Sequence, residues 1–153
     1  MTRETNKMKA IVVSGARSNV GKTHLSHSLC GLLPGAQRVK IGEHERKPGG
    51  DGSYYPMGTT FSSVVAEHPD ALFLIIESNQ ILKEITPDLA IFLPAEGAKP
   101  SAMFAVEKAD IVRGQPVSDE RVSVLAIRLG CEENVIRTII ELVNGTTGAP
   151  ARP

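Results

Sequence analysis

The sequence predicts a single-domain α/β fold, in which a mainly parallel sheet carries helices on both faces. The length of 153 residues suits one domain rather than two. Short apolar segments rich in β-branched residues, at 10–14, 71–77 and 88–93, have the pattern of buried strands. Helical patterns separate these segments. Strands that alternate with helices along a chain are typical of a parallel sheet covered on both sides.

The first half of the chain contains three further elements. After the strand at 10–14, a helix is expected from about Lys22, and Pro34 and Gly35 end it. Residues 39–42 form a second short strand. We interpret residues 43–58 as one long loop, a length that is uncommon in a compact domain unless the loop has a role. Thr59 or Thr60 can then cap a short helix that carries Phe61, Val64 and Val65.

The second half continues the alternation. A short helical piece is expected at 80–84, and Pro94 stops the strand at 88–93. Ser101 can cap a helix that runs to residue 108, and residues 111–112 suggest a short strand. Residues 119–129 fit either a strand or a helix. The last helix is expected over 132–143, followed by a stop at 144–145.

Composition limits the possible partners and the compartment. The chain has 17 basic and 17 acidic residues, so it lacks the basic excess of most nucleic-acid-binding proteins. Cys30 and Cys131 lie far apart and are expected to be free thiols in a reducing cytoplasm. We find no apolar stretch that could cross a membrane and no secretory signal. The expected organisation is a domain at 10–145 between flexible tails at 1–9 and 146–153.

The segment at 16–23 has the relaxed form of the Walker A phosphate-binding pattern. It places Ala16 where the strict pattern has glycine, while Gly15 comes one residue early. Backbone N–H groups of such a loop surround a phosphate, and the following helix points its N-terminus at the same group. Lys22 is expected to reach the β- and γ-phosphates, and the Thr23 hydroxyl to bind Mg²⁺. The predicted phosphate-binding residues are Ala16, Arg17, Ser18, Asn19, Val20, Gly21, Lys22 and Thr23.

A nucleotide site of this kind needs an acid near Mg²⁺, usually at the end of a neighbouring apolar strand. Glu77 ends the strand at 71–77 and is the best candidate; Asp70 and Asp88 stand at strand starts and are weaker ones. We therefore assign Thr23 and Glu77 to the metal. The guanine-recognition motif Asn-Lys-x-Asp is absent, so the pattern leaves GTP and ATP both open.

The stretch after the second strand is rich in cations and glycine. It contains Lys40, His44, Lys47 and Asp51, and it should hang at the carboxyl edge of the sheet, where α/β proteins bind ligands. Lys40 and His44, followed by the run Lys-Pro-Gly-Gly-Asp-Gly-Ser-Tyr at 47–54, resemble a motif of the MobB family. MobB is the molybdopterin-guanine dinucleotide biosynthesis protein B. The likeness covers about residues 10–114, with Gly52 as an insertion and Ser78 where the family has glycine.

The resemblance implies a GTP-binding P-loop NTPase with weak activity, which assists molybdenum-cofactor biosynthesis in the cytoplasm. It also implies a homodimer and partners that handle molybdopterin. Matching positions make Lys40, His44, Lys47 and Asp51 the lining of a pocket beside the phosphates. In this reading Lys22, Glu77 and Asp51 carry the chemistry.

Two alternatives remain open from the residues. One is an ATP-dependent small-molecule kinase, in which Asp51 or Glu77 acts as base on an acceptor hydroxyl. The other is a regulatory module in which residues 119–143 form two helices joined near Gly130 and Cys131. The neutral charge counts against DNA as its partner.

Overall fold

The computed structural model describes residues 7–16, 20–42, 53–96 and 100–145. The tail predicted at 146–153 lies outside these ranges, and so do residues 1–6 of the tail predicted at 1–9. Lys9 already belongs to the first strand, where it pairs with Phe73.

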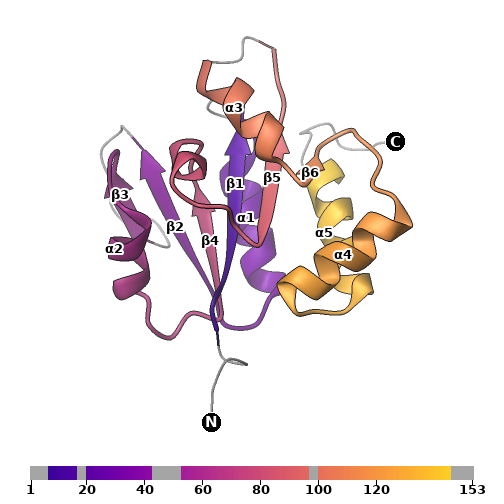
Figure 1. Cartoon of the computed structure of the whole chain (residues 1–153), viewed down its shortest axis with the longest axis horizontal. Coiled ribbons are helices and arrows are strands. Elements are labelled where there is room, and N and C mark those ends of the chain that lie inside the picture. The colour runs from indigo at the N-terminus through magenta and orange to yellow at the C-terminus, as the bar shows by residue number, and fades with distance from the viewer. Residues whose placement is uncertain (1–6, 17–19, 43–52, 97–99, 146–153) are drawn as a thin grey trace.

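The described residues form a six-stranded sheet with the order β3-β2-β4-β1-β5-β6, and every pairing is parallel (Figure 1). The predicted α/β class with a parallel sheet is therefore confirmed. The strands are β1 Lys9–Gly15, β2 Ala36–Gly42, β3 Ser53–Pro56, β4 Phe73–Glu77, β5 Leu89–Leu93 and β6 Ile111–Val112.

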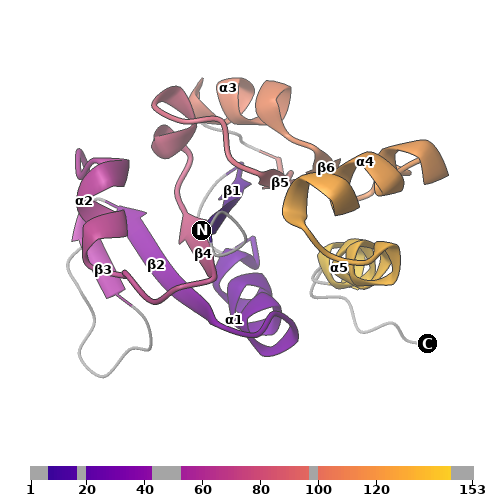
Figure 2. The same cartoon turned by 60° about the horizontal axis from the view of Figure 1, so that its bottom comes forward.

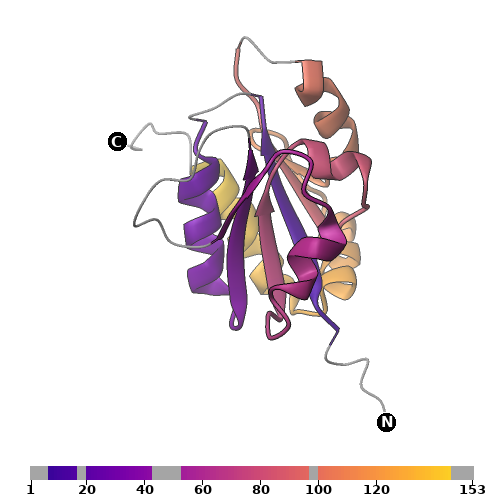
Figure 3. The same cartoon turned by 90° about the vertical axis from the view of Figure 1, so that its left-hand side faces the viewer.

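Helices cover both faces of the sheet (Figure 2). Two clusters of buried apolar side chains lie between helices and sheet, one on each face. The first includes side chains of α1, α4 and α5, and the second includes side chains of α2, η2 and α3. The view onto the β3 edge shows α1 and α2 on opposite sides of the strands (Figure 3). The helices are α1 Lys22–Leu32, α2 Phe61–Ala66, the 3₁₀ helix η2 Gln80–Lys83, α3 Pro100–Lys108, α4 Asp119–Leu129 and α5 Glu133–Gly145.

The central strands are buried on both faces, as their continuous apolar sequences predict. In β1, the side chains of Ile11 and Val13 belong to the first cluster, whereas Val12 belongs to the second. Leu25 and Leu29 bring the apolar stripe of α1 onto the first face. This packing holds the N-terminus of α1 at the carboxyl edge of the sheet.

The structure corrects two of the predicted elements. Residues 53–56, predicted as part of the long loop, form β3, which pairs with β2 from Val39 to Gly42. Pro56 is tolerated there because β3 is an edge strand and the proline is its last residue. The helix that was expected to follow a cap at Ser101 begins at Pro100 instead, and proline suits the first turn of a helix.

The structure also settles the cap of α2 and the conformation of residues 119–129. Thr60 caps α2 by accepting a hydrogen bond from the Ser63 N–H at 3.2 Å. The ambiguous residues 119–129 form α4, which Ser118 caps and Gly130 ends with a positive φ of 73°. Cys30 and Cys131 are free and half-buried, and burial raises the pKa of both thiols. Among the described residues, no helix is long and apolar enough to cross a membrane.

Candidate functional site

The candidate site lies where β1 ends and α1 begins, at the carboxyl edge of the sheet. Gly21 precedes α1 with a positive φ of 103°, a conformation that favours glycine. Its carbonyl accepts the first helical hydrogen bond, from the Leu25 N–H at 2.9 Å. The N-terminus of α1 therefore faces the end of β1, as the phosphate-loop pattern predicts.

Gly15 allows the two ends of this loop to approach each other. A Cβ atom on Gly15 would lie 2.7 Å from Cγ2 of Val20 and 3.3 Å from Cδ of Lys22. Such a contact with Val20 is too close for a real side chain. The glycine that seemed misplaced in the strict pattern is thus required by packing, and the stem of Lys22 folds over it.

Ala16 forms the base of the loop. Its backbone N–H donates to the Leu93 carbonyl at 2.9 Å, and the residue is 1% exposed. This N–H is therefore already used within the protein. The predicted phosphate contacts of Arg17, Ser18 and Asn19 lie outside the described residues.

Asn79 lies just after β4, before η2, and holds the end of β1. Its Oδ1 accepts from the Gly15 N–H at 3.0 Å, and its Nδ2 donates to the Gly15 carbonyl at 2.9 Å. One side-chain amide thus satisfies both backbone groups of the residue that starts the loop. Sequence reasoning did not identify this role of Asn79.

Arg113 holds the other end of the loop. Its guanidinium donates to the carbonyl of Val20 and to the carbonyl of Pro94, both at 3.0 Å. Burial lowers the pKa of this arginine from its usual value. Arg113 therefore ties the residue before Gly21 to the segment that follows β5.

The Thr23 hydroxyl and the Glu77 carboxylate meet at the start of α1. Thr23 Oγ1 donates to Glu77 Oε1 at 3.0 Å. Glu77 is the last residue of β4, which lies next to β1, and it is only 2% exposed. The two residues that the sequence assigns to one metal are thus brought together, and Glu77 is the acid beside the loop.

The second carboxylate oxygen of Glu77 has other partners. Ser26 Oγ donates to Oε2 at 2.5 Å, and Arg38 NH1 donates to it at 3.1 Å. The Arg38 side chain is 10% exposed, so this is a buried ion pair. Neither Ser26 nor Arg38 was singled out from the sequence.

The weaker candidates for the acid lie elsewhere. Asp70 is exposed in the turn before β4. The Asp88 carboxylate accepts from the Ala10 N–H at 2.8 Å, near the start of β1 and away from the loop at its end. Neither carboxylate has a hydrogen bond to Thr23 in the described part of the chain.

Lys40 lies on β2, next to Glu77 of β4. It is in register with Glu77 on one side and with Tyr54 of β3 on the other. Its side chain runs toward the carboxyl end of β2, because Cε lies 4.0 Å from the position that a Cβ on Gly42 would occupy. The other predicted pocket residues, His44, Lys47 and Asp51, fall in a segment that the structure does not describe.

The oxygen atoms present fit a hard divalent cation. A hydroxyl that donates its proton to a carboxylate keeps its lone pairs for a metal ion, and Glu77 adds carboxylate oxygens. Within the described residues, no three His, Cys, Asp or Glu side chains cluster in a way that could hold a metal ion. Mg²⁺ at nucleotide sites takes only one or two protein ligands and fills the others with phosphate and water, so a Thr–Glu pair suffices.

Comparison with known proteins adds no assignment. No protein-family model matches the chain. No curated protein matches it significantly. The functional argument therefore depends on the residues and their geometry.

Proposed function

We propose that this protein binds a nucleoside triphosphate with Mg²⁺ at residues 16–23 and hydrolyses it weakly. The observation that carries the proposal is the 3.0 Å hydrogen bond between Thr23 Oγ1 and Glu77 Oε1. It joins the last residue of the Walker A pattern to a buried acid at the end of the adjacent strand. That combination is what Mg²⁺-dependent phosphate binding requires.

Each residue then has a defined role. Lys22 neutralises charge on the β- and γ-phosphates, and the N-terminus of α1 adds its partial positive charge. Thr23 and Glu77 hold the cation, which would supply further neutralisation of phosphate charge when bound. Glu77 also orients the metal or an attacking water. The protein contributes position and electrostatics rather than a covalent step.

The resemblance to MobB supports a narrower proposal. In this narrower proposal, the nucleotide is GTP and the protein is a homodimer. The protein assists molybdenum-cofactor biosynthesis in the cytoplasm, together with partners that handle molybdopterin. The position of Lys40 supports this reading, since it lies in register with Glu77 beside the proposed phosphate site. The remainder of the motif, His44, Lys47 and Asp51, lies outside the described residues.

A calorimetric titration with GTP and then ATP, each with Mg²⁺, tests the proposal. We expect wild type to bind GTP more tightly and Lys22→Ala to lose binding. Lys108→Ala serves as the control, because that lysine lies exposed on α3 over the Phe104 ring. Tighter ATP binding would move the assignment to a small-molecule kinase, and binding of neither nucleotide would contradict the proposal.

A further inference from the structure

The two oxygens of the Glu77 carboxylate are used differently. Oε1 accepts from Thr23, on the side where the cation is proposed to bind. Oε2 accepts from Ser26 and Arg38, on the side of α1 and β2. The carboxylate is therefore anchored at one oxygen and presented at the other.

Arg38 is placed for this task by the register of the sheet. It pairs with Ile75 on β4, two residues before Glu77, so its side chain extends along the strand to reach the carboxylate. Arg38 also acts on Cys30 of α1. Burial raises the pKa of the Cys30 thiol, and the positive charge of Arg38 partly offsets that rise. Arg38 thus lies between α1 and β4, under the proposed metal site.

A carboxylate as buried as Glu77 requires a partner. Burial of an unpaired charge is strongly unfavourable, and an opposite charge with good hydrogen bonds offsets much of that cost. Arg38 provides both a positive charge and a directional donor. The site can therefore stay folded, with its carboxylate oriented, before any cation arrives.

We propose that Arg38 is the positioning residue of the metal site, which holds Oε2 of Glu77 so that Oε1 and the Thr23 hydroxyl face the cation together. The inference depends on the proposed function. Partners of a metal ligand commonly change metal affinity by about 10- to 100-fold when removed. Arg38 is expected to act in this way without touching the nucleotide.

The test compares Arg38→Met and Arg38→Lys with wild type. Nucleotide affinity is measured over a series of Mg²⁺ concentrations and again in EDTA, and thermal melting is followed in the same conditions. We expect Arg38→Met to need about tenfold more Mg²⁺ for the same affinity. Affinity in EDTA should be unchanged, and Arg38→Lys should recover part of the loss because it restores the charge.

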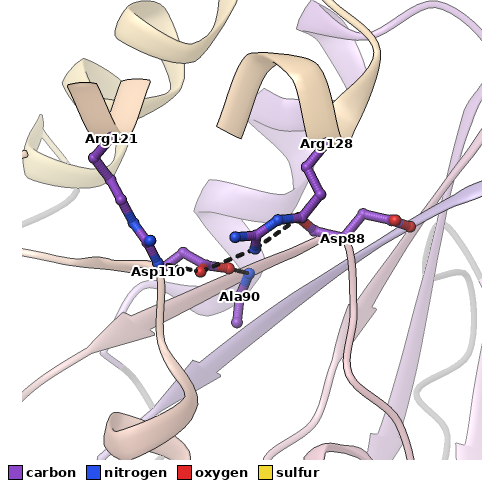
Figure 4. Close-up of polar contacts among 5 residues, drawn as sticks. All are labelled: Asp88, Ala90, Asp110, Arg121 and Arg128. Atoms are coloured by element: carbon purple, nitrogen blue, oxygen red, sulfur yellow. Dashed lines mark hydrogen bonds and ion pairs between the residues drawn. The ribbon is translucent and has the colours of Figure 1, made fainter. Parts of the chain in front are cut away.

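A matched control is available in a second arginine–carboxylate cluster. Arg128 pairs with Asp110 at 3.1 Å, and Asp110 also accepts from Arg121 and from the Ala90 N–H (Figure 4). Asp110 flanks β6, with β1 and β5 between that strand and Glu77. Arg128→Met should therefore lower stability without any change in Mg²⁺ dependence.

The outcomes separate the two proposals. If wild type binds nucleotide with Mg²⁺ and both Arg38 variants keep its Mg²⁺ dependence, the role of Arg38 is wrong and the proposed function stands. If Arg38→Met fails to fold, the Mg²⁺ requirement of Arg38→Lys is measured in its place. A raised requirement supports the role of Arg38, and an unchanged one overturns it. If wild type binds no nucleotide, the proposed function fails and this inference fails with it.

Discussion

Thr23 and Glu77 are 54 positions apart in the chain, yet their side chains are joined by a hydrogen bond of 3.0 Å. The contact exists because α1 packs over the strands and β4 lies beside β1, where Val13 pairs with Glu77. Parallel pairing brings the ends of both strands to one edge. The proposed metal site is thus a product of the strand order.

Removal of the charge on Glu77 should show how much the buried ion pair with Arg38 stabilises the fold. Glu77→Gln keeps only one acceptor oxygen, for Thr23 or for Ser26 but not for both, and it removes the negative charge that pairs with Arg38. We expect a loss of about 3 kcal/mol in the free energy of unfolding, since a buried pair is broken. Denaturant unfolding measures it. Combination with Arg38→Met should recover part of the loss, and strictly additive losses would contradict the ion pair.

Gly15 should not tolerate alanine. The added Cβ would lie 2.7 Å from Val20 Cγ2, and such overpacking typically costs about 1–3 kcal/mol. The loop would also open, so nucleotide affinity should fall. Gly31→Ala is the matched control, because nothing lies within 4 Å of its Cβ position and alanine favours the helix. A Gly15→Ala protein as stable as wild type would argue against this loop geometry.

Asn79 should matter through both of its amide atoms. In Asn79→Ala, the N–H and carbonyl of Gly15 lose their partners, at a cost of about 2 kcal/mol. Asn79→Asp keeps the acceptor but places a carboxylate oxygen against the Gly15 carbonyl, so it should also be less stable than wild type. Thermal melting ranks the three proteins. Asn134→Ala, an exposed asparagine of α5, is the control and should be near neutral.

Arg113→Lys should loosen the far end of the loop. A lysine can reach one of the two carbonyls, at Val20 or Pro94, but it cannot span both as the guanidinium does. We expect a loss of about 1 kcal/mol in stability and weaker nucleotide binding with an unchanged Mg²⁺ dependence. Arg137→Lys, on an exposed surface pair, should change neither. An altered Mg²⁺ dependence in Arg113→Lys would mean that this arginine acts on the metal instead.

Much of the fold could be predicted because its strands are continuous apolar runs with turn residues between them. The site elements could be predicted for a similar reason. Gly21, Lys22 and Thr23 form a local pattern, and Glu77 ends a strand, so both are visible without knowledge of which strands are neighbours.

The partners of these residues could not be predicted in the same way. Arg38 and Asn79 look like ordinary polar residues, and only the pairing of β2 with β4 and of β4 with β1 gives them their contacts. The strand β3 was missed because, although its two tyrosines favour a strand, it has only four residues, ends in proline and follows a glycine-rich stretch. The pairing of β3 with β2 depends on tertiary structure, which local strand propensity does not predict.

The most direct test of the central claim compares wild type with Thr23→Val by calorimetric titration with GTP, in Mg²⁺ and in EDTA. Valine keeps the shape of threonine and removes the hydroxyl that joins Glu77 to the proposed cation. We predict that EDTA weakens the wild type strongly, and that Thr23→Val in Mg²⁺ binds GTP no better than wild type does in EDTA. Full Mg²⁺-dependent binding by Thr23→Val, or no Mg²⁺ dependence in wild type, would contradict the claim that Thr23 and Glu77 form a metal site.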